Sequence, residues 1–270
     1  MNALGIIAGG GRLPTQLIEA CEASGRSCFV LALGGSADIP SIAHVPHATV
    51  RIGAVGAALK HLRNAGAKDI VLAGSVRRPT LFSLRPDLAG IKLLLRLGLK
   101  FFSGDDALLT ALVKFFEDEG FHVVGSDEIL SALLAPEGIL GNVKPSAVQQ
   151  SDIAHGIEAA RKLGALDIGQ AAVVENGHVL GVEGTEGTDA LIACCGTLRR
   201  AEKSGVLVKM SKPNQEKRAD LPAIGMQTVE NIHAAGLAGI AIEAGAALIL
   251  DKEKTIARAD ALGIFIVGVT

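Results

Sequence analysis

The chain has 270 residues, of which 49% are hydrophobic and 20% are charged. This balance predicts a folded protein with a well-filled core, in one large domain or two of ordinary size. The net charge is −2, and Trp and Tyr are absent. These features exclude a protein that works mainly by binding duplex nucleic acid, which needs a strong basic field, or by base stacking, which needs aromatic platforms. We expect no nucleic-acid partner.

Cysteine usage and hydropathy indicate a cytoplasmic protein. The four cysteines form no CxxC pair, and no His lies at metal-ligand spacing from them. They are expected to be small buried side chains in a reducing compartment. The first residues, MNALGIIAGG, have no basic segment before their short apolar run, and no later stretch approaches the roughly 18 apolar residues of a membrane span.

Short apolar runs alternate with helical patterns in the first half of the chain. The predicted strands are 4–8, 28–33, 50–52, 69–73 and 121–124, and the predicted helices are 13–25, 55–65 and 105–119. This alternation is typical of a parallel sheet with crossover helices. We therefore predict a Rossmann-like α/β domain over residues 1–134.

Turn-forming residues then crowd the segment 135–145, which we interpret as a linker. Beyond it, the predicted helices are 151–163, 228–236 and 252–262, and the predicted strands are 171–174, 178–182, 206–210, 239–242, 247–250 and 264–269. The first two strands form a predicted hairpin, because Asn176-Gly177 between them suits a type I′ turn. These elements predict a second α/β domain over residues 146–270.

Three polar loops of the first half border predicted strands and helices. They are GGGRLP at 9–14, GSVRRP at 74–79 and SGDD at 103–106, and GGGRLP matches neither the GxGxxG nor the Walker A pattern. Glycines let a backbone approach a ligand closely, helix N-termini direct N–H groups at anions, and Arg suits phosphate oxygens. The carboxyl edge of a parallel sheet is where ligands bind. A tight turn, two solvated arginines and a plain N-cap are the structural alternatives.

A second polar group lies beyond the predicted linker. Acids, bases and glycines concentrate in 167–170, 183–189 and 209–222, and the irregular stretch 211–225 is longer than most connections in compact domains. Glu183 and Asp220, with Lys209 and Lys212, suit a metal ion held against a diphosphate, since Mg²⁺ prefers one or two carboxylates plus phosphate oxygens. Each acid taken alone also fits a solvated turn residue.

The segment 81–102, LFSLRPDLAGIKLLLRLGLKFF, interleaves leucines and phenylalanines with basic residues. A basic amphipathic helix of this kind can lie in a membrane surface or against an acyl chain. The alternative is a core helix with solvated basic residues. The lack of a Trp or Tyr anchor in the segment weakens the membrane hypothesis.

Seven of these segments, taken in order, resemble one known family over nearly the whole chain. They are IIAGGGRLP, LAGSVRRP, GDDALL, LDIGQAAVV, VEGTEGTDA, KPNQEKRADLPAIG and AGLAGIAIEAG. Each motif alone is weak, but their ordered set is similar to the UDP-2,3-diacylglucosamine diphosphatases of the LpxI type.

The resemblance implies a Rossmann-like N-terminal domain, a C-terminal α/β domain particular to the family, and an active site in the cleft between them. It implies hydrolysis of UDP-2,3-diacylglucosamine to UMP and 2,3-diacylglucosamine 1-phosphate, a step of lipid A biosynthesis, with a divalent cation, usually Mg²⁺. The family's essential carboxylate falls on Asp220. A homodimer and a peripheral contact with the inner-membrane surface are further expectations.

Within this scheme we hypothesise that Asp220 is the catalytic residue, as a metal ligand or water-orienting base, and that Glu183 and Asp189 are further metal candidates. The substrate-binding candidates are Gly10, Gly11, Arg12, Gly74, Ser75, Val76, Arg77, Gly104, Asp105, Asp106, Gln170, Thr188, Lys209 and Lys212. Two other classes stay open. A NAD-dependent dehydrogenase predicts an acidic residue at the end of the second strand, where this chain has Gly34-Gly35-Ser36. A non-catalytic nucleotide-sugar sensor predicts binding without release of UMP.

Overall fold

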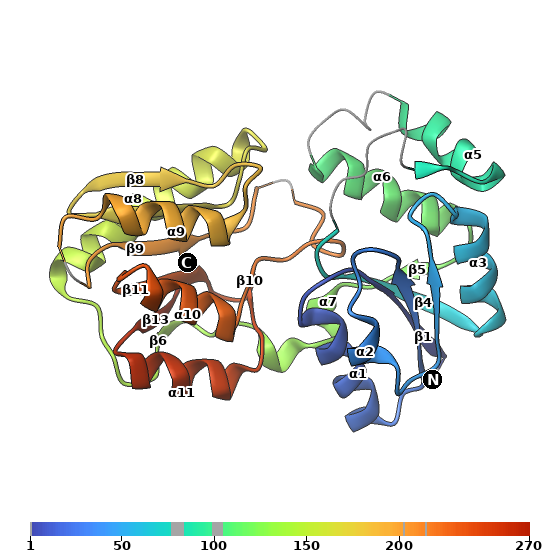
Figure 1. Ribbon diagram of the computed structural model, residues 1–270, viewed down its shortest axis with the longest axis horizontal. Helices are drawn as coiled ribbons and strands as arrows, with labels where there is room; N and C mark the ends of the chain where they lie inside the picture. Colours follow the sequence, from blue (N-terminus) through green and yellow to red (C-terminus); the bar gives the residue numbers. More distant parts are fainter. Residues whose placement is uncertain (1, 77–83, 99–104, 202, 214) are drawn as a thin grey trace. The chain divides into compact units, whose positions relative to one another are not determined.

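The computed structural model describes residues 2–76, 84–98, 105–201, 203–213 and 215–270, with the side chain of Asp105 excepted. The chain divides into two compact units. Unit 1 consists of Met1–Ser131 and Glu216–Asp220, and unit 2 consists of Ala132–Gln215 and Leu221–Thr270. Figure 1 shows a sheet with helices on both sides in each unit. Within the described residues, no helix combines the length and apolar composition that spanning a bilayer requires.

The sheet of unit 1 is entirely parallel, as the alternating pattern predicted. Its strands are β1 (Ala3–Ala8), β2 (Cys28–Leu33), β3 (His47–Val50), β4 (Ala67–Ala73) and β5 (His122–Val123), in the spatial order β3-β2-β1-β4-β5. The chain moves outward in one direction from β1 to β3 and then returns to place β4 on the other side of β1. The strand order therefore reverses between β1 and β4, which is the point where open α/β sheets bind ligands.

Helices cover both faces of this sheet (Figure 1). They are α1 (Leu13–Ser24), α2 (Ile39–Ile42), α3 (Val55–Asn64), α5 (Leu88–Leu97), α6 (Asp105–Asp118) and α7 (Ser126–Ile129), and a 3₁₀ turn follows at Ser131–Leu133. On one face, Leu59 of α3, Leu93 of α5 and Phe115 of α6 pack in one core with Ile7 and Ile70 of the sheet.

One carboxylate joins two of these helices. Asp87 caps α5 by accepting a hydrogen bond from Gly90 N at 2.8 Å, and its other oxygen accepts from Gly56 N in the first turn of α3, also at 2.8 Å. An acidic side chain is favourable at both positions, because each helix N-terminus leaves unpaired N–H groups. The cap therefore orients α5 against α3.

Unit 2 has a six-stranded mixed sheet. Its strands are β6 (Gly138–Leu140), β7 (Ala171–Glu175), β8 (His178–Val182), β9 (Val206–Lys209), β11 (Gly239–Glu243) and β13 (Phe265–Val269), in the order β6-β13-β11-β9-β7-β8. The three central strands β9, β11 and β13 are parallel, and β6, β7 and β8 each run antiparallel to a neighbour. Two short strands, β10 (Ala223–Ile224) and β12 (Leu248–Ile249), pair separately.

In the described part of the unit, four helices pack on this sheet, which confirms the α/β class of the second half. They are α8 (Ala147–Ala165), α9 (Thr188–Leu198), α10 (Met226–Ala234) and α11 (Lys252–Leu262). Ile153 and Ala160 of α8 share a core with Val208 and Phe265 on one face of the sheet. Helices α9, α10 and α11 bury Ile192, Val229, Ile232 and Ala259 in a second core, with alternate strand residues that include Val173, Leu207 and Ile240.

Several elements differ from the sequence prediction. The third strand is four residues long and ends at Val50, so it lies earlier than the predicted 50–52. Helix α8 begins at Ala147 rather than near Ser151, because Ser146 and Gln149 form a capping box. Strand β6 lies inside the segment predicted as a linker, and α9 was not predicted. The hairpin of β7 and β8 was predicted correctly, and Asn176 and Gly177 have φ of 49° and 77°, as a type I′ turn requires.

Candidate active site

The first candidate region is the carboxyl edge of β1 and β4 in unit 1. The loops that follow these two strands hydrogen-bond to each other: Gly10 N donates to Ser75 O at 2.8 Å, and Ser75 N donates to Gly10 O at 2.9 Å. Gly9 N also donates to Ala73 O at 2.8 Å. The structure thus brings two of the predicted ligand loops together at the point where the strand order reverses.

Two glycines permit this close approach of the two loops. Gly74 has φ of 88°, and a Cβ atom on it would lie 2.3 Å from Gly10 O. A Cβ atom on Gly9 would lie 2.4 Å from Ser75 O. Gly11 differs, because its φ is 89° but nothing lies within 4 Å of its ideal Cβ position. Gly9 and Gly74 therefore serve the contact between the loops, whereas Gly11 leaves an open backbone surface beside it.

Arg12 stands at the N-cap of α1, with Pro14 in the first turn. Its guanidinium donates to Thr15 Oγ1 at 2.9 Å and forms an ion pair of 2.8 Å with Glu19. Arg12 therefore has protein partners beside the glycine loop. Its expected contact with substrate stays a prediction.

The other substrate candidates of unit 1 are only partly described. Ser75 and Val76 follow Gly74, and the Val76 side chain is 41% exposed. Arg77 and Gly104 lie outside the described residues, as do parts of the amphipathic segment 81–102. Asp105 and Asp106 are the first two residues of α6, so the predicted loop leads directly into a helix.

The second candidate region is the edge of the unit 2 sheet at which the parallel strands end. Lys209 is the last residue of β9 and Glu243 is the last residue of β11. Strand β7 begins at this edge, because Ala171 pairs with Lys209. Strand β8 ends here and is followed by Glu183. Residues from four strands therefore converge on one edge.

A chain of buried polar groups crosses this edge. Lys209 is 8% exposed and donates from Nζ to Thr188 Oγ1 at 3.1 Å; Ala223 O lies 3.5 Å away. The Thr188 hydroxyl donates in turn to Glu183, which is 7% exposed and also accepts from Gln170 N at 3.0 Å. The Gln170 Oε1 atom is buried and has no hydrogen-bond partner within the described residues. Four of the predicted residues thus form one connected network.

The structure gives the remaining unit 2 candidates protein partners. Lys212 Nζ forms an ion pair of 2.6 Å with Asp167 Oδ1. Asp189 lies in the first turn of α9, is exposed, and accepts a hydrogen bond of 2.8 Å from Asn231. Over the described ranges, no three His, Cys, Asp or Glu side chains cluster as metal ligands would.

Asp220 belongs to unit 1, although the sequence on either side of Glu216–Asp220 belongs to unit 2. Its backbone N donates to Glu216 O at 3.1 Å, so it ends a hydrogen-bonded turn. Asp220 is half-buried. The sequence pattern assigns residue 220 to the second domain, but the structure gives this carboxylate and the glycine loops to the same unit.

Two features of the structure were missed from the sequence. Glu243 accepts a hydrogen bond of 2.7 Å from Ser211 N, beside Lys209 on the neighbouring strand. Its position at the end of a predicted strand could have drawn attention to it, as it did for the glycine loops. The second feature is a pocket between α3, α5 and α6, described next.

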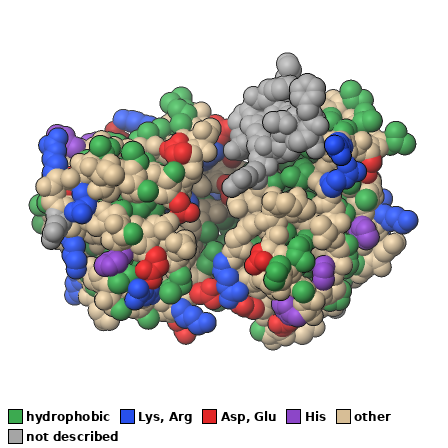
Figure 2. Space-filling view, viewed as in Figure 1, with side chains coloured by type: hydrophobic (Ala, Val, Ile, Leu, Met, Phe, Trp, Pro, Cys, Tyr) green, Lys and Arg blue, Asp and Glu red, His purple; other side chains and the backbone are tan. Residues whose placement is uncertain are grey.

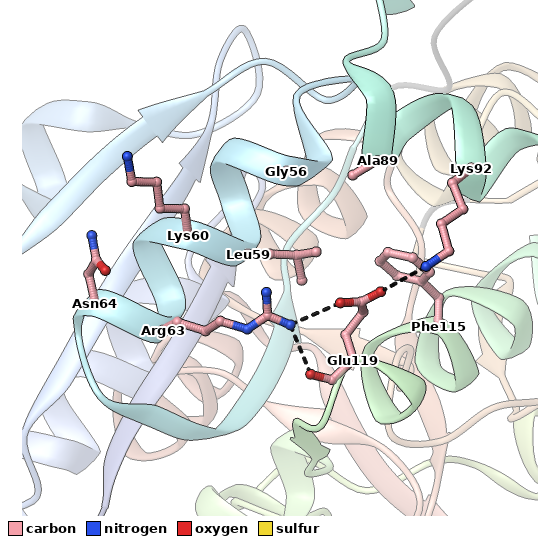
Figure 3. A pocket seen from close by; sticks show the side chains of 9 residues that line it. All are labelled: Gly56, Leu59, Lys60, Arg63, Asn64, Ala89, Lys92, Phe115 and Glu119. Carbon is pink, nitrogen blue, oxygen red and sulfur yellow. Dashed lines mark hydrogen bonds and ion pairs between the residues drawn. The ribbon is translucent and has the colours of Figure 1, made fainter.

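This pocket has a volume of about 440 Å³ and is lined by Gly56, Leu59, Lys60, Arg63, Asn64, Ala89, Lys92, Phe115 and Glu119. Figure 3 shows Arg63 and Lys92 pointing at Glu119, while Lys60 points away. The Glu119 carboxylate lies 2.9 Å from Arg63 Nη2 and 3.6 Å from Lys92 Nζ. The hydrogen bond from Arg63 holds the pKa of Glu119 below its usual value, against the opposing effect of burial. The charges lining the pocket therefore largely satisfy one another.

Fold and edges together define an α/β protein with a Rossmann-like unit and a second mixed-sheet unit, both with polar sheet edges suited to a phosphate-bearing ligand. The model of the LpxI N-terminal domain matches residues 3–133, and the model of the LpxI C-terminal domain matches residues 136–267. The chain belongs to the LpxI family.

Two known proteins illustrate what the chain is similar to. A protein of Caulobacter vibrioides named UDP-2,3-diacylglucosamine pyrophosphatase LpxI is 45% identical over 275 residues, which cover 100% of this chain and 98% of that protein. The structure of UDP-glucose 4-epimerase from Thermus thermophilus in complex with NAD matches 95% of this chain and 93% of that chain, at 13% identity and a TM-score of 0.32.

Proposed function

We propose that this protein hydrolyses the diphosphate of UDP-2,3-diacylglucosamine, giving UMP and 2,3-diacylglucosamine 1-phosphate, in lipid A biosynthesis. The observation that carries this proposal is the 45% identity, over the full chain, to a protein named for that pyrophosphatase activity. Both family models, which together run from residue 3 to residue 267, support it.

The edge of unit 1 supplies the nucleotide part of the proposed site. Gly10 and Gly11 precede α1, whose N-terminus directs backbone N–H groups toward an anion. Gly74 and Ser75 lie against them through the paired hydrogen bonds. Because nothing covers the ideal Cβ position of Gly11, a phosphate can approach the backbone there. Arg77 and Gly104 are proposed to extend this surface.

The edge of unit 2 supplies the cation for the diphosphate. A buried ammonium costs free energy unless it is paired, and Lys209 contacts only a hydroxyl and one distant carbonyl in the described part of the chain. An anionic ligand would compensate this charge. The Thr188 hydroxyl, fixed by Glu183, orients the ammonium. We propose that Lys209 stabilises charge on the diphosphate and that Gln170 and Lys212 line the same edge.

We propose Mg²⁺ as the cofactor, with Asp220, Glu183 and Asp189 as its candidate ligands. Oxygen donors are the right chemistry for this ion. Gln170, whose backbone N donates to Glu183, adds a buried Oε1 atom that has no hydrogen-bond partner among the described residues. Mg²⁺ commonly binds through one or two carboxylates plus substrate phosphates, so it needs no closed protein cage. When bound, it would neutralise charge on the phosphate oxygens. Asp220 would orient the attacking water or hold the ion.

The test is release of UMP from UDP-2,3-diacylglucosamine by the purified chain with Mg²⁺. We expect Asp220→Asn to lower turnover by at least about 100-fold while the substrate still binds, because this carboxylate acts on the reacting groups. The exposed surface acid Asp118, changed to Asn, is the control. Substrate binding without release of UMP by the unmodified chain would favour the nucleotide-sugar sensor. Hydride transfer to or from NAD would favour the dehydrogenase.

We further propose that unit 1 contacts the inner-membrane surface through α5. Leu88, Ile91 and Leu95 form one outward stripe of this helix and are 87%, 45% and 78% exposed. Figure 2 shows hydrophobic and basic side chains together over the position of α5. Lys92 and Arg96 lie beside the stripe at helical spacing, so apolar and anionic parts of a bilayer surface both find partners.

Sedimentation with vesicles containing anionic lipid tests this contact. Leu95→Ser should reduce the bound fraction, while Leu166→Ser, at a leucine of unit 2 that is 70% exposed, should not. Equal binding by all three proteins would reject the contact.

For the homodimer we propose pairing through β8, an outer strand of the described sheet with Val179 and Val182 each 41% exposed. A monomer mass by light scattering would reject it.

A further inference from the structure

Unit 1 contains a second, very short segment of the chain. Only Glu216–Asp220 returns to it, between two long runs of unit 2. This stretch contains Asp220, whose carboxylate is essential for hydrolysis in the proposed function. So short a segment can build no core of its own, so its position depends on the contacts it makes.

One arginine makes most of these contacts. Arg218 forms a two-pronged ion pair with Glu216, from Nε to Oε1 and from Nη2 to Oε2, at 2.8 Å each. Its remaining nitrogen, Nη1, donates to Glu117 Oε1 of α6 at 2.7 Å. The guanidinium therefore joins the turn to the helix with three hydrogen bonds of fixed direction, which the ammonium of a Lys cannot reproduce.

The next residues continue the attachment. Ala219 packs against the core shared by α3, α5 and α6. The backbone N atoms of Ala219 and Asp220 both donate to Glu216 O, at 2.9 Å and 3.1 Å. The backbone carbonyl of Glu216 thus holds the turn, and the carboxylate of Glu216 holds Arg218. The hydrogen bond from Arg218 keeps the pKa of Glu216 below its usual value. The turn and its ion pair form one small unit fixed to α6.

We propose that Arg218 is a positioning residue for Asp220, acting through its bonds to Glu216 and to Glu117 of α6. This inference rests on the proposed function. Helix α6 begins with Asp105 and Asp106, which are both candidate substrate-binding residues. The same helix therefore carries two candidate substrate-binding residues at one end and the anchor of the proposed catalytic carboxylate at the other. A catalytic carboxylate has to be held to within a fraction of an ångström by such supporting contacts.

The anchor is expected to affect turnover more than stability. Arg218 and Glu117 are each 39% exposed, and exposed ion pairs add little to global stability. The neighbouring pair of Arg96 with Asp118, at 3.0 Å, has side chains 45% and 48% exposed and ends on the same turn of α6. That pair holds no catalytic segment, so it is a matched control.

The experiment compares Arg218→Lys, Arg218→Ala and Glu117→Gln with Asp118→Asn. We expect kcat for UMP release to fall at least tenfold in Arg218→Ala and Arg218→Lys, with KM and Tm close to those of the unmodified chain. Amide hydrogen exchange at Ala219 and Asp220 should become faster in the same variants. Glu117→Gln should lower kcat less, and combined with Arg218→Ala it should add nothing further. Asp118→Asn should change none of these values.

Two results would overturn the proposal. One is unchanged kcat in Arg218→Ala despite faster exchange, which would show that the turn is anchored but that the anchor does not serve catalysis. The other is unchanged exchange in Arg218→Ala, which would show that the arginine does not hold the turn. If the unmodified chain releases no UMP, the proposed function fails on that result alone. The exchange measurement then still decides whether Arg218 anchors the segment.

Discussion

The two sheet edges of this protein are formed by different chemical groups, backbone amides in unit 1 and buried side chains in unit 2. In unit 1, the loops after β1 and β4 meet through backbone groups, with Gly9 and Gly74 allowing the contact. In unit 2, the edge is a network of buried side chains in which Glu183, Thr188 and Lys209 take part. A backbone edge offers N–H groups that every substitution except one to Pro leaves in place, whereas a side-chain edge depends on individual charges. The two edges should therefore fail in different ways when they are changed.

The sharpest test of this difference is Lys209→Met, which removes a buried charge and keeps most of the side-chain volume. We expect turnover of UDP-2,3-diacylglucosamine to fall by about 10²–10³-fold, because the loss of one preorganised charge donor has that order of effect. Stability should be kept or should rise, since a buried ammonium with few partners costs free energy. Steady-state kinetics and thermal melting measure the two effects.

Lys254→Met is the control for this variant, because Lys254 is an exposed lysine of α11 in the same unit. It should change neither turnover nor Tm. A loss of stability in Lys209→Met, with turnover intact, would mean that the ammonium is a structural group. The side-chain edge would then not differ in function from an ordinary buried network.

The backbone edge is tested by Gly74→Ala. The φ of 88° is unfavourable for Ala, and the new Cβ atom would lie 2.3 Å from Gly10 O. We expect the free energy of unfolding to fall by about 1–3 kcal/mol from strain in the backbone, and activity to fall along with it as the two loops separate. Chemical denaturation gives the first value.

Gly66→Ala separates the two causes of that loss. Gly66 has φ of 68°, but nothing lies within 4 Å of its ideal Cβ position. The cost there should be about 1 kcal/mol, from the left-handed conformation alone. Equal costs at both glycines would mean that the contact between the loops contributes nothing, and the backbone edge would be only a turn.

The difference between the edges also explains what the sequence could predict. Strands β1, β2 and β4 of unit 1 contain short apolar runs that are followed by glycines, so the core of the parallel sheet and its ligand loops follow from local patterns. Helix α9 was missed because TDALIACCGTL contains mostly small and apolar residues, so the contrast between a buried and an exposed face is faint. Strand β6 was missed because it has three residues and pairs with β13, far along the chain.

The candidate site was predictable to a similar degree. Sequence patterns indicated Gly10, Gly74, Thr188 and Lys209, and the structure joins them in two groups. No pattern could show that Lys212 pairs with Asp167, or that Asp189 bonds to Asn231, since those contacts depend on tertiary packing. Nor could it show that the Asp220 segment belongs to unit 1, because the sequence on both sides of it reads as one continuous domain.

A smaller loss of turnover is expected when the hydrogen-bond network of unit 2 is weakened but its charged groups are kept. Thr188→Val removes the hydroxyl between Glu183 and Lys209 and keeps the side-chain shape. We expect turnover to fall roughly tenfold, since a hydrogen bond to a charged group contributes about 1.5–3 kcal/mol. Thr188→Ser keeps the hydroxyl and should retain most of the activity. If the Ser and Val variants lose activity equally, the methyl group matters and the network does not.

The smallest effect on turnover should come from the opposite edge of the unit 2 sheet, where we expect a buried carboxylate to contribute to stability alone. Glu175 ends β7 at the end away from Lys209 and is 2% exposed. Burial raises its pKa, but hydrogen bonds from the Ser204 hydroxyl and from Arg200 N outweigh that effect, so the pKa lies below its usual value. A carboxylate with a lowered pKa in the folded state stabilises the fold above the unfolded pKa of about 4.3, and this contribution is lost as the pH falls through the folded value.

Glu175→Gln should therefore cost about 1–2 kcal/mol of unfolding free energy at pH 7, where the lost hydrogen bonds are those of a charged acceptor. The difference from the unmodified chain should shrink as the pH falls from 6 to 3, and urea denaturation across that range measures it. Glu137→Gln, at an exposed acid of the same unit, should show no such trend. Turnover at pH 7 should stay unchanged in both variants. A large loss of turnover in Glu175→Gln would show that the two edges of this sheet are coupled, and the chemistry could then no longer be assigned to the Lys209 edge alone.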